Sequence, residues 1–162
     1  MDVNERITLA LEKYADMVKR ICFIHTKNDA DTDDIFQEVF LKYMQHNKPF
    51  DSAEHEKAWL IRVAINKCKD THKSFWRRNV TYLDETQVDA PNELEIKSDV
   101  MSAVLTLPVN YRNTIYLFYY EGYTAVQIAK MLGKNENTIY SWLHRAKSML
   151  KERLRGAANE YF

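Results

Sequence analysis

The spacing of the apolar residues is the feature that most constrains how this chain folds. From Val3 to Ile24 the apolar residues recur every three or four positions, at Val3, Ile7, Ala10, Tyr14, Val18 and Ile21. This spacing predicts an amphipathic helix with one buried stripe. Only three glycines and three prolines occur among 162 residues, so few interruptions of helices are expected. The chain is therefore predicted to be all-α.

Two more helices are predicted in the first half. Asp31 and Thr32 are possible N-caps of a helix that ends near Asn47 and buries Phe36, Val39, Phe40 and Tyr43. A loop of about ten residues follows, from His46 to Glu56, because this segment contains Pro49 and several turn formers. A third helix is predicted from about residue 56 to 75, with Trp59 in the core.

Residues 81–98 are acidic, contain Pro91 and have no sustained helical period, so they predict a linker. The predicted architecture is two small helical domains, at 1–75 and 98–158, joined by a flexible acidic linker at 76–97. The charges divide the chain in the same way, because an acidic segment lies between two basic ones. Residues 61–78 have six basic and one acidic group, and residues 134–155 have six and two, while 79–100 have one and six. Either two cationic surfaces meet one polyanion, or both are ordinary solvated helix faces.

Residues 122–150 predict a helix-turn-helix. Ala129 is small enough for close helix approach, Gly133 permits the positive φ that ends the first helix, and Ile139 and Leu143 pack the second helix back. The side chains left on other faces are Glu136, Tyr140, Ser141, His144, Arg145 and Lys151. Such a helix suits the major groove, and its N-terminus near 135–138 suits a phosphate. An ordinary helical hairpin is the alternative. Trp142, at the edge of the apolar stripe, is predicted to be half-buried.

Other function classes receive little support. Cys22 and Cys68 are too few for a disulfide framework and are expected to be reduced, packed thiols. Cys68 and His72 share a predicted helix face, but two ligands do not make a structural metal site. We expect no enzyme activity and no cofactor, because no phosphate loop or nucleophile motif occurs. Without an export signal or a run of about 20 apolar residues, a cytoplasmic protein without membrane insertion is expected.

Three blocks of sequence, in order, resemble the extracytoplasmic-function sigma factors, which bring bacterial RNA polymerase to promoters. "DTDDIFQEVFLKYM" (31–44) and "KAWLIRVAINKCKD" (57–70) resemble the helices of sigma region 2. "LPVNYRNTIYLFYYEGYTAVQIAKMLGKNENTIYSWLHRAKSML" (107–150) is similar to sigma region 4 almost throughout. The blocks cover about 100 residues. The resemblance implies a promoter-specificity subunit that binds core RNA polymerase and promoter DNA, and an anti-sigma factor as a further partner.

The resemblance also implies roles for individual residues. The core polymerase would be bound by a stripe on the second helix, at Asp34, Gln37, Glu38 and Leu41. The downstream promoter element would be bound by the loop and the third helix, through Lys48, Phe50, Ser52, Arg62, Asn66, Lys69 and Lys73. The upstream element would be bound by Lys134, Thr138, Tyr140, Ser141, His144 and Arg145. A solvated acidic face is the alternative for the first set, and a loop anchor is the alternative for Phe50.

The second helix of the helix-turn-helix departs from the family pattern at three positions. Many members have Gly at the position of Asn137, Lys or Arg at that of Tyr140, and Arg at that of Trp142. Two cations are thus missing, so weaker or different base recognition is expected, with contact to thymine methyl groups. Two other functions remain as alternatives. One is a stand-alone helix-turn-helix repressor or activator whose first half dimerises or senses a ligand. The other is a small enzyme with a DNA-binding tail.

Overall fold

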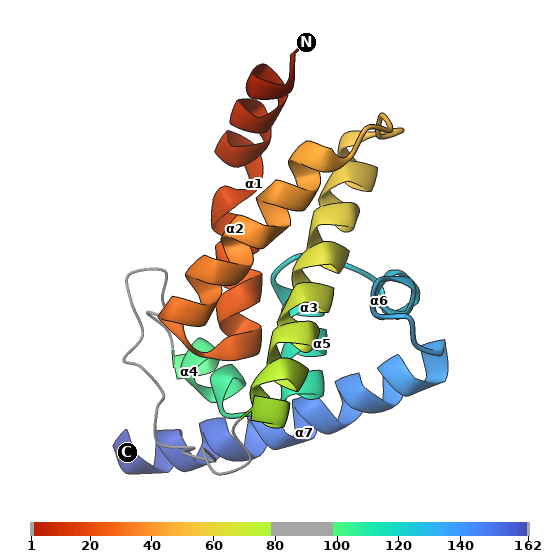
Figure 1. Cartoon of the computed structure of the whole chain (residues 1–162). Coiled ribbons are helices and arrows are strands. Elements are labelled where there is room, and N and C mark those ends of the chain that lie inside the picture. The colour runs from red at the N-terminus through yellow and green to blue at the C-terminus, as the bar shows by residue number, and fades with distance from the viewer. Residues whose placement is uncertain (1, 79–98, 162) are drawn as a thin grey trace. The chain divides into compact units, whose positions relative to one another are not determined.

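The computed structural model describes the backbone of residues 2–78 and 99–161, and the side chains of residues 2–71 and 99–155. The described residues form helices and connecting turns, without a strand. The chain divides into two compact units, Met1–Leu94 and Glu95–Phe162 (Figure 1). The predicted all-α fold with two helical units is confirmed. Of the predicted linker at 76–97, residues 76–78 belong to a helix and the rest lies outside the described residues.

Three helices form the first unit: α1 (Val3–Thr26), α2 (Asp29–Gln45) and α3 (Ala53–Arg78). Each packs against the other two, and α2 runs opposite to α1 and α3 (Figure 1). The Asp2 side chain caps the start of α1 by accepting a hydrogen bond from the backbone N–H of Glu5. The helix ends where Lys27 adopts a left-handed conformation, with φ of 54°.

The core of the first unit lies between these three helices. Val18 on α1, Val39 on α2 and Leu60 on α3 are fully buried. The predicted stripe of α1 is correct for Ala10, Tyr14, Val18 and Ile21. It is wrong for Val3, which is 50% exposed. Figure 1 shows the reason, because the first turns of α1 project beyond the ends of α2 and α3.

The second helix starts at Asp29, at least three residues earlier than the sequence predicts. Asn28, rather than Asp31 or Thr32, is the N-cap of α2, and its side chain accepts a hydrogen bond from the Asp31 N–H. Thr32 is buried instead, with its hydroxyl 3.1 Å from the Thr26 hydroxyl. The sequence suggested Asp31 and Thr32 as caps, whereas the turn from α1 places Asn28 at the cap position.

The loop between α2 and α3 comprises residues 46–52 and is shorter than the predicted 46–56. Ser52 is the reason, since its hydroxyl accepts a hydrogen bond of 3.0 Å from the His55 N–H and so caps α3. The helix therefore begins at Ala53, three residues before the predicted start. Trp59, assigned to the core, is half-buried and lies among aromatic rings at this end of the unit.

The second unit contains α4 (Asp99–Leu105), α5 (Val109–Tyr119), α6 (Ala125–Leu132) and α7 (Glu136–Tyr161). The long α7 packs against the other three helices of the unit. Leu107, Ile115, Ile128 and Ile139 are at most 1% exposed and lie in the core. Pro108 ends the α4 segment and stands at the start of α5, where a proline has no helical N–H to lose.

Within the described parts of the chain, no helix has both the length and the apolarity needed to cross a membrane. The same part of the chain holds no group of three or more histidine, cysteine or acidic side chains placed to bind a metal ion. Cys22 and Cys68 are both buried free thiols. The hydrogen bond with Cys22, together with burial, raises the pKa of the Cys68 thiol.

Candidate nucleic-acid and protein interfaces

The helix-turn-helix is formed by α6, α7 and the turn between them. A reciprocal capping box starts α6: the Thr124 hydroxyl accepts from the Gln127 N–H, and the Gln127 side chain accepts from the Thr124 N–H. Gly133 ends α6 in a left-handed conformation, with φ of 65°, as the sequence predicts. This sharp stop lets α7 cross back over α6.

The start of α7 is already partly capped. The Asn135 side chain accepts a hydrogen bond of 2.8 Å from the N–H of Asn137. One of the amides that the sequence offered to a phosphate is therefore used within the protein. Lys134, the residue before this cap, is exposed, so its ammonium group can approach a phosphate near the helix N-terminus.

The outward face of α7 carries the residues predicted to contact the upstream element. Ile139, Leu143 and Ala146 are buried, and this places the exposed Tyr140 and His144 on other faces of the helix. Tyr140 is 55% exposed, so its ring is accessible to a partner. The remaining predicted side chains on this helix are half-buried at Thr138 and Ser141 and exposed at Arg145. Trp142 is half-buried, as the sequence predicts.

Arg145 has a partner that the sequence did not reveal. Its Nη1 donates a hydrogen bond of 3.4 Å to the hydroxyl of Tyr111 on α5. Two residues later, the ammonium of Lys147 lies 5.1 Å from the ring centre of Phe118 and 5.6 Å from that of Tyr119. These contacts hold two cations of α7 against α5. The interacting residues are 28 to 34 positions apart, so no local pattern could have predicted them.

Arg112 on α5 is a buried cation. Its Nη1 donates a hydrogen bond of 2.9 Å to the Leu107 carbonyl, tying α5 to the end of the α4 segment. Burial lowers the pKa of the guanidinium to about 10, so the side chain remains charged at neutral pH. It therefore has a structural position and is not available to DNA.

On α2, the stripe predicted to bind polymerase is exposed. Asp34, Gln37, Glu38 and Leu41 are all exposed, whereas Ile35 and Val39 on the opposite face are buried. Leu41 is 56% exposed. An apolar side chain of this size beside three polar ones is suited to docking against a partner protein. Phe36, predicted to be buried, is half-buried and lies against Phe40 and the Lys19 ammonium.

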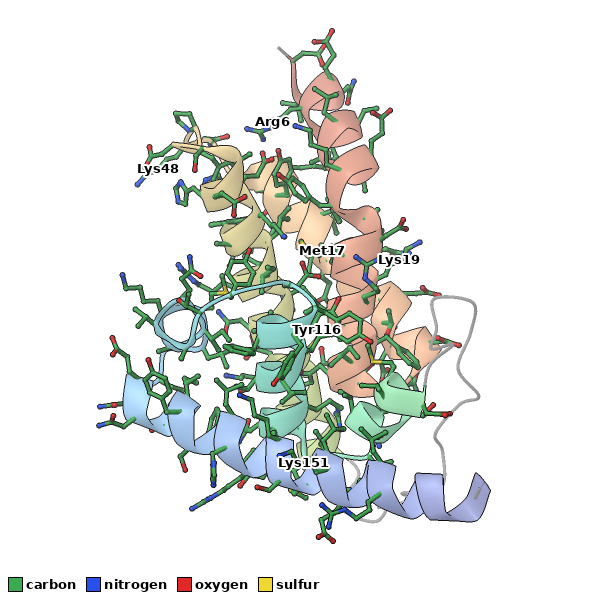
Figure 2. The ribbon with its side chains drawn as sticks, turned by 180° about the vertical axis from the view of Figure 1, so that it is seen from behind. Arg6, Met17, Lys19, Lys48, Tyr116 and Lys151 are labelled. Atoms are coloured by element: carbon green, nitrogen blue, oxygen red, sulfur yellow. The ribbon has the colours of Figure 1, made fainter. Side chains whose placement is uncertain are left out.

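The three residues predicted to form a pocket in the loop 46–52 have different surroundings. Lys48 is exposed at the end of the first unit (Figure 2). Phe50 is half-buried, and its ring is stacked on His46 with the ring centres 4.8 Å apart. The hydroxyl of Ser52 already accepts the α3 capping hydrogen bond. Lys48 and Ser52 are thus both exposed, but the Ser52 hydroxyl is engaged at the start of α3.

Polar side chains of α3 continue from this loop along one face. Arg62 and Asn66 are exposed and one helical turn apart. Lys69 follows on the same face and is half-buried. The side chain of Lys73 lies outside the described residues. The cationic face predicted for the third helix therefore has at least its first half open to a nucleic-acid backbone.

Comparison with known proteins identifies both units. Residues 10–79 match the family model "Sigma-70 region 2", and residues 97–150 match "Sigma-70, region 4". The chain is 31% identical over 148 residues to the ECF RNA polymerase sigma factor SigL of Mycobacterium tuberculosis, covering 86% of this chain and 84% of that protein. It is 26% identical over 161 residues to the ECF RNA polymerase sigma factor SigW of Bacillus subtilis, covering 88% and 85%.

Two solved structures share the fold. The sigma factor RpoE, crystallised with the anti-sigma factor NepR from Bartonella quintana, has a TM-score of 0.78 at 18% identity and covers 93% of this chain and 98% of its own. CnrH, in complex with the cytosolic domain of CnrY, has a TM-score of 0.61 at 18% identity, covering 94% and 90%. The chain belongs to the extracytoplasmic-function RNA polymerase sigma factors, which are initiation factors rather than enzymes and recognise promoters together with core RNA polymerase.

Proposed function

We propose that three surfaces of this sigma factor divide the work of promoter-directed initiation. The stripe of Asp34, Gln37, Glu38 and Leu41 on α2 docks on core RNA polymerase. The loop 46–52 and the polar face of α3 bind the downstream promoter element. The outward face of α7 binds the upstream element. In this proposal residues 1–75 form the promoter-opening domain, 76–97 the linker and 98–158 the upstream-binding domain.

The observation that carries the proposal is the separation of buried and exposed faces on the same helices. On α2 and α7 the candidate residues lie on the faces left exposed when the core residues are buried. An exposed face with Leu41 on α2 favours a protein partner, whereas Tyr140, His144 and Arg145 on α7 favour base edges and phosphates. The two kinds of surface therefore suit two kinds of partner.

The downstream element would be bound as unstacked single-stranded bases. An irregular loop can surround a base, and the cationic side chains of the neighbouring helix can follow the phosphates. The loop supplies Lys48, Phe50 and Ser52. The neighbouring helix α3 supplies Arg62, Asn66, Lys69 and Lys73, which are spaced along it. Because few cations are present, isolated duplex binding is expected to be weak, and polymerase supplies the remaining affinity.

Two further parts of the proposal concern the cell. The protein acts in the cytoplasm, where core RNA polymerase and the chromosome are found. It is held inactive by an anti-sigma factor until a signal arrives. The structure of the sigma factor RpoE with the anti-sigma factor NepR, which shares this fold, supports an anti-sigma partner of this kind.

The test is to add the purified protein to bacterial core RNA polymerase with fragmented genomic DNA of its host and to sequence the 5′ ends of the transcripts. Discrete starts that share two spaced upstream elements are expected. A demonstrably active core that yields no such starts, together with tight DNA binding by the protein alone, would support the stand-alone regulator instead.

A further inference from the structure

The last turn of α2, immediately before the loop 46–52, is held by an arginine from the start of the chain. Arg6 lies on α1, and its Nη2 donates hydrogen bonds of 3.3 Å to the carbonyls of both Tyr43 and Met44. Figure 2 shows Arg6 at the same end of the unit as Lys48 in the loop. The final carbonyls of a helix have no partner within the helix, so a cation there satisfies them and complements the helix dipole.

The same arginine also contacts the aromatic side chain of this turn. Its guanidinium carbon lies 5.3 Å from the ring centre of Tyr43. The Tyr43 hydroxyl in turn donates a hydrogen bond of 2.9 Å to Glu56 Oε2 on α3. Tyr43 is only 2% exposed, so its ring is fixed between α1 and α3. The end of α2 is thereby connected to both neighbouring helices.

From Tyr43 the aromatic contacts continue into the loop. The Phe50 ring is stacked with that of Tyr43, at 6.1 Å and 17° between planes, and with that of His46, at 4.8 Å and 13°. Trp59 and His55 lie edge-on to Phe50, with ring centres at 5.6 Å and 5.3 Å. With so many rings around it, Phe50 anchors the loop and has little surface left on which a base could stack.

Both ends of the loop are also held by hydrogen bonds. At its start the His46 N–H donates to the Tyr43 carbonyl, the same atom that Arg6 contacts. At its end the Asp51 N–H donates to His55 Nδ1 at 3.1 Å, and Ser52 caps α3. The loop is thus attached at its start, middle and end. Its exposed side chains, among them Lys48, project from a backbone whose position depends on the turn that Arg6 holds.

We propose that Arg6 is a positioning residue for promoter opening: through the last turn of α2, Tyr43 and Phe50, it sets the conformation of the loop that captures unstacked promoter bases. The region 2 match begins at residue 10, so Arg6 lies before the part of the chain that the family model covers. The inference rests on the downstream-element role proposed above for the loop. It assigns Phe50 to the anchor and leaves base contact to the exposed residues of the loop.

The experiment compares wild-type protein with Arg6→Ala, Arg6→Lys and Lys13→Ala, each assembled with core polymerase. Lys13 is an exposed cation on the same helix and serves as the matched control. The DNA is a promoter found by 5′-end sequencing, used once as a duplex and once with its downstream element already melted by mismatches. The readouts are the rate of open-complex formation and the affinity for core polymerase.

On duplex DNA, Arg6→Ala is expected to lower the rate of opening about tenfold, because the loop no longer captures the first unstacked bases efficiently. On melted DNA its rate is expected to be within about twofold of wild type, because base unstacking no longer limits the reaction. Arg6→Lys should recover part of the loss, since it keeps the charge at the helix end but has no planar fork. Lys13→Ala should match wild type on both templates.

A second pair of variants covers the case in which Arg6→Ala fails to fold. Phe50→Leu removes the aromatic stacking and should show the same dependence on the template, whereas Phe50→Tyr should retain most of the duplex activity. Equal losses on both templates, or full duplex activity of Arg6→Ala, would overturn the proposal. Failure of the wild-type protein to initiate at any promoter would instead refute the proposed function itself.

Discussion

The hydroxyl of Tyr43 donates a hydrogen bond of 2.9 Å to Oε2 of Glu56, joining the last turn of α2 to the first turn of α3. Burial, followed by this hydrogen bond to a carboxylate, raises the pKa of Tyr43 to about 12 from its ordinary value of 10.0. The bond spans the loop 46–52, so it also determines how far apart the two ends of the loop lie.

This pKa shift predicts a pH dependence of stability. The folded protein holds the Tyr43 proton more tightly than the unfolded chain, so the stabilisation is fully present below pH 10 and is lost as pH rises from 10 to 12. Tyr43→Phe lacks the titrating group and the hydrogen bond, which contributes about 1.5 to 3 kcal/mol when the acceptor is charged. Urea unfolding across this pH range should show the wild-type advantage over Tyr43→Phe shrinking.

The comparison of wild type with Tyr43→Phe is needed because the pKa shift of another group changes stability with pH in the opposite direction. Arg112 has its pKa lowered to about 10, so its neutralisation in the folded state makes the protein more stable as pH rises. Both proteins contain Arg112, and its contribution cancels in the comparison. A difference that stays constant from pH 9 to pH 12 would contradict the raised pKa of Tyr43.

Gly133 should tolerate side chains according to their ability to adopt a left-handed conformation. A Cβ at this position would have no atom within 4 Å, so the cost of a substitution comes from the backbone, whose φ is 65°. Gly133→Ala is expected to lower the free energy of unfolding by about 1 to 2 kcal/mol, and Gly133→Asn by less. Thermal denaturation of the two variants would reveal the order, and equal losses would argue against backbone strain.

Leu41 and Glu38 should matter for binding but not for folding. Both side chains are exposed, so alanine substitution should change the free energy of unfolding by less than about 0.5 kcal/mol. If α2 docks on core polymerase, each substitution should weaken that complex about fivefold or more. Glu12→Ala on α1, also an exposed carboxylate, is the matched control. Titration of fluorescent protein with core polymerase measures the affinity, and unchanged affinity in both variants would exclude this docking face.

Tyr140 and Lys134 should differ in how salt affects promoter binding. If Lys134 contacts a phosphate as proposed, Lys134→Ala removes that contact, and the slope of log affinity against log salt concentration should fall by about one. Tyr140→Ala should weaken binding at every salt concentration without changing the slope, because its ring carries no charge. Holoenzyme binding measured at several salt concentrations separates the two effects. An altered slope for Tyr140→Ala would mean that the substitution displaces neighbouring cations.

The local sequence was sufficient for the helix-turn-helix. Gly133, Ile139 and Leu143 lie close together in the chain, and the glycine stop and the apolar spacing determine both helices and the turn. The faces of α2 and α7 followed in the same way, since burial of Val39 or Ile139 leaves the other faces of each helix outside. Helix starts were harder to predict, because several polar residues near 28–32 and 52–56 can serve as caps.

By itself, the sequence determined the helical periods, the division into two helical units and the exposed faces, because these depend on residues within a few turns of one another. Only the tertiary structure decided that Arg6 holds the end of α2, that Phe50 anchors its loop and that Arg145 reaches Tyr111. The pairs Arg6 with Tyr43 and Arg145 with Tyr111 lie 37 and 34 residues apart. Such contacts form only when packing of the apolar stripes brings separate helices together, and no local pattern encodes which partners then meet.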